Sequence, residues 1–110
     1  MKHLVAVLSE PREGHDAEYD KYYETLHLDE VLASTGWLSA QRFVLSDEAG
    51  AKCPLPYLAL YEVEANDPAT IIPTMDATRA QRQQSGSLNR RTAGVWVFSP
   101  TGPVHRNPSE

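Results

Sequence analysis

The segment Tyr57-Leu58-Ala59-Leu60-Tyr61-Glu62-Val63 decides the predicted fold, because it is rich in strand-forming residues and almost wholly apolar. A strand of an antiparallel sheet with one face in water alternates apolar and polar residues. This segment does not alternate, and neither do the predicted strands at residues 4–8 and 93–98. Both faces of the predicted sheet should therefore be covered.

The other elements follow on either side of this strand. Residues 37–46 predict a further strand, and residues 16 to about 33 predict a helix, since aromatic and apolar residues recur there at three- and four-residue spacing. Ser34-Thr35-Gly36 should end that helix. A second helix is predicted from Pro68 to about residue 84, with a kink or restart at Pro73, which lacks an amide donor. The order β-α-β-β-α-β predicts an α+β, ferredoxin-like fold: an antiparallel four-stranded sheet with two helices on one face.

Two helices can cover only one face of such a sheet. A second copy of the chain, meeting the first sheet to sheet, is the simplest cover for the other face, and closed two-fold dimers are the commonest oligomers. We therefore predict a homodimer. The alternative is that short strands have irregular patterns by chance, in which case no partner is needed.

The composition limits the other partners and the location. The 110 residues predict one domain, residues 1–100, followed by a flexible tail, residues 101–110. The net charge is −5 and the only adjacent basic pair is Arg90-Arg91, which argues against nucleic acid. Cys53 has no second cysteine for a disulfide or a thiolate zinc site. The apolar run at residues 4–8 is too short for a signal peptide or a membrane span, so we expect a cytoplasmic protein that does not contact membranes.

A set of short motifs occurs in a fixed order just before and along the first predicted helix: Glu13-Gly14, Asp16-Ala17-Glu18-Tyr19, Tyr22-Tyr23, His27-Leu28 and Val31-Leu32. Together with Ser39-Ala40-Gln41-Arg42-Phe43 and the strand at residues 57–62, they resemble the EthD-like proteins of the dimeric α+β barrel superfamily, over about residues 3–100. The resemblance implies a barrel formed by two chains. Relatives in that superfamily include cofactor-independent monooxygenases, lactone isomerases, polyketide cyclases and haem-binding proteins. This chain departs from the pattern at Asp29, where relatives often carry proline.

His27 is the first candidate catalytic residue. It follows Tyr23 by four residues, so the two side chains can share a helix face with Tyr19. A histidine that titrates near neutral pH beside a phenol can shuttle protons on an enol or lactone. The alternative is structural, because an imidazolium is favoured at the end of a helix. We expect His27 to line a cavity between the first helix and the sheet.

Arg42 and a group of aromatic residues complete the candidate site. Strand alternation places Arg42 on a largely apolar face, where a cation needs a carboxylate from the protein, a second subunit or a ligand. We predict that it positions an oxyanion beside His27 and Tyr23; a structural ion pair is the alternative. The candidate substrate-binding residues are aromatic and could instead be plain core packing: Tyr19, Tyr22, Trp37, Trp96 and Phe98.

Several familiar kinds of site are missing from the sequence. The histidines at positions 3, 15, 27 and 105 lack the spacing of a helical metal site, and there is no glycine-rich phosphate loop. We therefore expect no metal, nucleotide or other cofactor. Asp76 and Arg79 lie one helical turn apart and should form a solvated ion pair.

The predicted function is the binding of a small hydrophobic or aromatic molecule. The resemblance implies a cofactor-independent enzyme that acts on an aromatic, lactone or polyketide-like compound by acid–base chemistry, as an isomerase, cyclase or monooxygenase does. A non-catalytic ligand-binding or accessory protein is the alternative, and haem binding by His27 is a third possibility.

Overall fold

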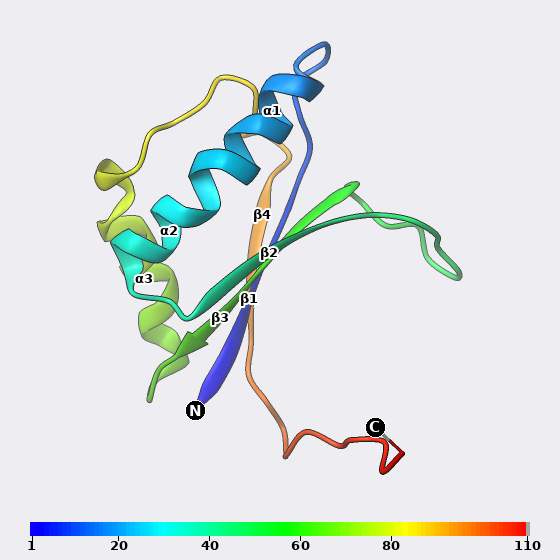
Figure 1. Ribbon diagram of the computed structural model, residues 1–110, viewed down its shortest axis with the longest axis vertical. Helices are drawn as coiled ribbons and strands as arrows, with labels where there is room; N and C mark the ends of the chain where they lie inside the picture. Colours follow the sequence, from blue (N-terminus) through cyan, green and yellow to red (C-terminus); the bar gives the residue numbers. More distant parts are fainter. Residues whose placement is uncertain (110) are drawn as a thin grey trace.

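A computed structural model describes residues 1–109 and contains one antiparallel sheet with all of the helices on one side of it (Figure 1). The strands lie in the order β2-β3-β1-β4, so that β1 and β3 are central. Every neighbouring pair is antiparallel. The predicted β-α-β-β-α-β order is confirmed, and the architecture is compatible with a ferredoxin-like fold. The strands are β1 (Lys2–Ser9), β2 (Ser39–Val44), β3 (Tyr57–Glu64) and β4 (Gly94–Phe98).

The first helical region is continuous but changes its winding in the middle. An α-helix, α1 (Asp16–Tyr22), leads into a π-helical turn, η1 (Tyr23–His27), and then into a second α-helix, α2 (Leu28–Thr35). The region ends at Gly36, whose φ of 77° lies in the left-handed region that glycine adopts without steric cost. The predicted end of this helix is confirmed.

The second helical region begins at Pro68 as predicted, but it ends about three residues early and is divided into three short pieces. It consists of a 3₁₀ turn η2 (Pro68–Thr70), the helix α3 (Ile71–Ala77) and a further 3₁₀ turn η3 (Arg79–Gln81). The expected restart occurs at Ile71, before Pro73 rather than at it. Pro73 is the third residue of α3, where a backbone N–H has no acceptor within the helix, so the helix tolerates it.

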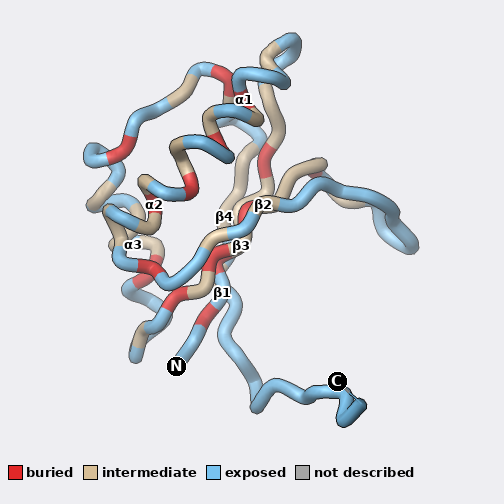
Figure 2. The backbone as a smooth tube through the Cα atoms, in the orientation of Figure 1, coloured by how far each residue is buried: buried red, intermediate tan, exposed pale blue. Residues whose placement is uncertain are grey.

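The core lies between the helices and one face of the sheet. Alternate residues of the central strands point toward the helices, and their side chains are buried, as the red segments of Figure 2 show. The helices contribute Tyr19, Tyr23, Leu28, Val31 and Ile71; the strands contribute Val5, Ala59, Tyr61 and Val63.

The opposite face of the sheet, here called the outer face, is also apolar. In the strand register Ala6 pairs with both Leu60 and Trp96, which places all three on this face. Trp96 is 46% exposed and Phe98 is 58% exposed. No element among residues 1–109 covers this face, so the continuous apolar strands reflect two apolar faces, of which one is packed.

Two irregular segments extend from the side of the sheet opposite the helices. One is the connection between β2 and β3, and the other is the chain after β4 (Figure 1). Residues 45–52 and 99–109 are exposed throughout (Figure 2). Residue 110, the last of the predicted tail, lies outside the described residues. No helix among residues 1–109 combines the length and the apolar character needed to cross a membrane.

Candidate functional site

The π-helical turn sets the position of His27. Buried residues follow the helix at positions 19, 23, 28 and 31, so the step from Tyr23 to the next buried residue is five positions rather than four. Leu28 therefore takes the place in the buried stripe that α-helical spacing assigns to His27. His27 lies at the edge of the stripe, half-buried, rather than inside it. Single π turns of this kind are frequent at functional sites.

Two tyrosines hold the imidazole in place. The ring of His27 stacks on Tyr22 at 4.8 Å between centroids and meets Tyr23 edge-on at 4.9 Å. The Tyr22 hydroxyl lies 2.9 Å from Nδ1 of His27 and donates to the carbonyl oxygen of Gln83 at 2.8 Å. A carbonyl only accepts, so the single hydroxyl proton of Tyr22 is committed to Gln83 and Nδ1 of His27 must carry the proton between them. Nε2, which has no hydrogen-bond partner among residues 1–109, is left as an acceptor.

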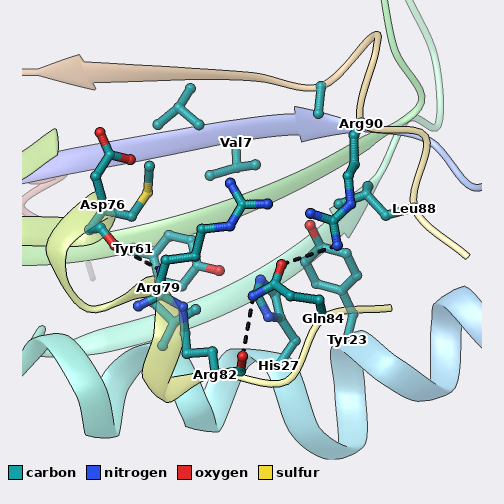
Figure 3. A pocket seen from close by; sticks show the side chains of 14 residues that line it. Val7, Tyr23, His27, Tyr61, Asp76, Arg79, Arg82, Gln84, Leu88 and Arg90 are labelled. Atoms are coloured by element: carbon teal, nitrogen blue, oxygen red, sulfur yellow. Dashed lines mark hydrogen bonds between the residues drawn. The ribbon is translucent and has the colours of Figure 1, made fainter. Parts of the chain in front are cut away.

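His27 lines a cavity of about 220 Å³ between the first helical region and the sheet, as predicted from its position in the sequence (Figure 3). The sheet contributes Val7, Tyr61 and Val95 to the wall. Tyr23 lines the same cavity, so the structure brings together two of the three predicted catalytic residues. Burial raises the pKa of the hydroxyls of Tyr23 and Tyr61, which keeps both protonated as hydrogen-bond donors.

The cavity also has a basic wall that the sequence reasoning missed. Arg79, Arg82 and Arg90 line it, and Asp76 is the only acidic residue between positions 1 and 109 that does so. The sequence does contain an indication of this basic wall, because four of the ten basic residues of the chain fall within residues 79–91. The predicted Asp76–Arg79 ion pair is wrong: within residues 1–109 the two side chains are not within salt-bridge distance, and in Figure 3 they point in different directions.

The third predicted catalytic residue, Arg42, does not reach this cavity. Its guanidinium lies over the rings of Tyr19, Tyr23 and Tyr57, 4.4 to 5.4 Å from their centroids. It donates to Asp20 at 2.6 Å, which confirms the alternative reading of a structural ion pair. Arg42 touches the far side of Tyr23 and can act on the cavity only by positioning that ring.

The predicted substrate-binding aromatics are scattered rather than gathered at one site. Tyr19 is fully buried and its hydroxyl lies 2.5 Å from that of Ser9, and burial raises its pKa to about 12. Trp37 packs edge-on against Tyr61 in the core, 5.3 Å between centroids. Trp96 and Phe98 lie on the outer face. Only Tyr22 supports the cavity, through His27.

The environment of His27 makes stability depend on pH. Burial, and then the charge of Arg82, lower the pKa of His27 from 6.5 to about 4, so the expectation that it titrates near neutral pH is wrong. At pH values between about 4 and 6.5, His27 is protonated in the unfolded chain but not in the folded protein. The contribution of neutral His27 to the free energy of unfolding is therefore fully present above pH 6.5 and is lost as the pH falls through about 4.

We expect His27→Gln to remove this part of the pH dependence. From pH 6.5 to pH 4, the free energy of unfolding of the wild type should fall by about 2–3 kcal/mol more than that of the variant. Urea unfolding at a series of pH values measures both. His15→Gln, at a partly exposed histidine that bonds Glu18, is the control and should keep the wild-type slope. Parallel curves for wild type and His27→Gln would show that the imidazole is not shielded.

The site therefore combines an oriented neutral imidazole, two protonated phenols and three guanidinium groups around one partly apolar cavity. None of the protein-family models, curated proteins or solved structures compared with the chain matches it. The chemistry of the site has to be inferred from its own residues.

Proposed function

We propose that the protein binds a small ring-containing molecule in the His27 cavity and moves a proton on it, without a cofactor. The observation that carries this proposal is the hydrogen-bonded chain from Gln83 through Tyr22 to Nδ1 of His27, which leaves Nε2 as a free acceptor at the cavity. A histidine whose tautomer is fixed by a partner on one nitrogen is suited to take a proton with the other. The resemblance to EthD-like proteins supports the same kind of chemistry.

The other cavity residues define the proposed roles. Nε2 of His27 accepts a proton from a carbon next to a carbonyl group. The hydroxyl of Tyr23, kept protonated by burial, donates a hydrogen bond to the oxyanion that forms. Arg42 is a positioning residue in this scheme, because it contacts the ring of Tyr23 and not the cavity. Enolisable aromatic, lactone and polyketide-like compounds are the substrate class that this chemistry fits.

Hydrogen–deuterium exchange at carbon tests the proposal without knowledge of the natural substrate. A panel of enolisable single-ring lactones and cyclic ketones is incubated with the protein in D₂O, and loss of the α-proton signal is followed by NMR. We expect at least one member to exchange faster than in buffer. His27→Gln, which keeps hydrogen-bonding capacity but not the base, should slow that exchange by roughly 10²–10⁴-fold.

A matched variant separates catalysis from general effects of losing a histidine. His15→Gln removes a partly exposed imidazole outside the cavity and should leave the exchange rate unchanged. Exchange that is equally fast in the wild type and His27→Gln would remove His27 from the mechanism. Binding of panel members without exchange would instead favour the second candidate function, a ligand-binding or accessory protein that uses the same cavity.

Haem does not suit this cavity. Pockets for drug-sized ligands measure about 300–1,000 Å³, and a haem macrocycle is larger than such ligands. The His27 cavity, at about 220 Å³, is smaller than this range.

We also propose that two copies of the chain form a homodimer through their outer faces, as in a dimeric α+β barrel. The outer face is apolar, and Trp96 and Phe98 stand exposed on it. The β2–β3 connection and the chain after β4 extend on the same side, where they would flank a second copy (Figure 1). In a two-fold dimer each contact between different residues occurs twice, so each apolar residue of the outer face contributes two contacts to the interface.

A further inference from the structure

The charge of the His27 cavity is opposite to that of the chain. The chain carries a net charge of −5, whereas the cavity is lined by three arginines and one aspartate. His27 does not offset this imbalance, because burial and Arg82 keep its imidazole neutral near pH 7. An acidic protein that surrounds one cavity with guanidinium groups favours an anion there.

Arg82 contributes charge but has little capacity left to bind a ligand. Its side chain is buried, and it donates to the hydroxyls of Ser34 and Thr78 and to the carbonyl oxygen of Met75. All three acceptors are neutral, and no carboxylate among residues 1–109 lies within 4.0 Å of its nitrogens. A buried cation that only neutral groups solvate adds a positive field to the cavity wall.

Arg79 and Arg90 are the arginines with free donors. Arg79 makes no side-chain hydrogen bond to any residue from 1 to 109, and Arg90 donates only to the side-chain oxygen of Gln84. Neither guanidinium lies within salt-bridge distance of a carboxylate of residues 1–109. Figure 3 shows the two side chains reaching the cavity on either side of His27. A guanidinium presents two parallel N–H groups that match a carboxylate.

The floor of the cavity is apolar and small. Val7 and Val95 from the sheet, with Val31 and Met75 from the helices, supply its apolar lining. An apolar cavity of about 150 Å³ holds benzene, so about 220 Å³ accommodates one ring and a small substituent.

Resting on the proposed function of this cavity, we propose that its ligand is a single-ring carboxylate. The carboxylate lies between Arg79 and Arg90, and the ring lies on the Val7 and Val95 floor, next to Nε2 of His27. The arginines thereby select an acid and orient the ring, and they do not take part in proton transfer.

Calorimetric titration of the 110-residue protein with matched ligands tests this assignment. Benzoate is compared with benzamide, which keeps the ring but has no charge, and with inorganic phosphate, which keeps the charge but has no ring. We expect benzoate to bind at least about tenfold more tightly than either, since hydrogen bonds to charged groups are the stronger ones. Arg79→Gln and Arg90→Gln should each weaken benzoate binding about 10–100-fold and leave benzamide binding unchanged.

The control is Arg106→Gln, which removes the same charge from an exposed position in the tail. It should leave benzoate binding unchanged. Equal binding of benzoate and benzamide would overturn the carboxylate assignment while leaving the cavity as a ligand site. Phosphate binding as tight as that of benzoate would overturn the ring. If no ring compound binds, the assignment fails together with the proposed ligand site.

Discussion

Leu60→Glu is expected to convert the proposed homodimer, of twice the 12.2 kDa chain mass, into a folded monomer. Leu60 lies on the central strand β3 and is paired across the outer face with Ala6 and Gln41. A carboxylate buried in an apolar interface costs several kcal/mol, and the two-fold axis introduces it twice. The dissociation constant should rise at least about 10³-fold, which corresponds to about 4 kcal/mol.

Sedimentation at micromolar concentration measures both masses. Ala33→Glu introduces the same carboxylate at an exposed position of α2, on the side of the sheet that carries the helices, and should remain dimeric. Circular dichroism should show that Leu60→Glu keeps its helix content, because the helix-side core is untouched. A wild-type protein that sediments as a monomer would remove the dimer from the proposal.

Asp20→Asn is expected to destabilise the protein more than Arg42→Met does. Arg42 is 9% exposed and depends on Asp20, whereas Asp20 is 50% exposed and can be hydrated alone. Removing the carboxylate leaves a shielded cation whose nearest remaining acid is Glu24, at 3.9 Å. We expect a loss of about 1–3 kcal/mol from Asp20→Asn.

Methionine in place of Arg42 removes the cation together with a buried Nε that has no hydrogen-bond partner among residues 1–109. It also keeps an unbranched apolar chain among the three tyrosine rings, so the cost should be smaller than that of Asp20→Asn. Urea unfolding of both variants, and of the double variant, gives the comparison. A larger loss of stability from Arg42→Met than from Asp20→Asn would mean that the contacts of Arg42 with the tyrosine rings outweigh its ion pair.

The strands could be predicted because their signal is local. Residues 57–63 are strand formers without interruption, and the observed β3 differs from the prediction by one residue. The second helix could not be predicted with its correct length. Its expected last turns contain Arg82, whose side chain turns inward to bond Ser34 and Thr78 while its backbone becomes extended. Such tertiary contacts override helix propensity and are invisible to a count of residue types.

The candidate site was predicted only in part. His27 and Tyr23 were found from their four-residue spacing, which is again a local signal, although the π turn moves His27 to the edge of the stripe on which that spacing would place it. Arg79 lies in η3, after α3, and Arg90 lies in the connection between η3 and β4, so only the folded chain places them beside His27. Alternation placed Arg42 on the correct face of its strand. Alternation does not show which residues of the other elements meet that face, so the partner of Arg42, Asp20, could not be predicted.

The π-helical turn has a consequence for how this chain compares with relatives that have a regular helix. A π turn holds one residue more than an α turn, so a relative without it should be one residue shorter between the positions of Tyr23 and Leu28. An alignment without a gap would then shift every residue on one side of the turn by one position. Such a shift would pair His27 with a residue that faces the core. We expect genuine relatives to be recognised only when a single-residue gap is allowed within residues 23–28, and the histidine to be gained or lost together with that residue.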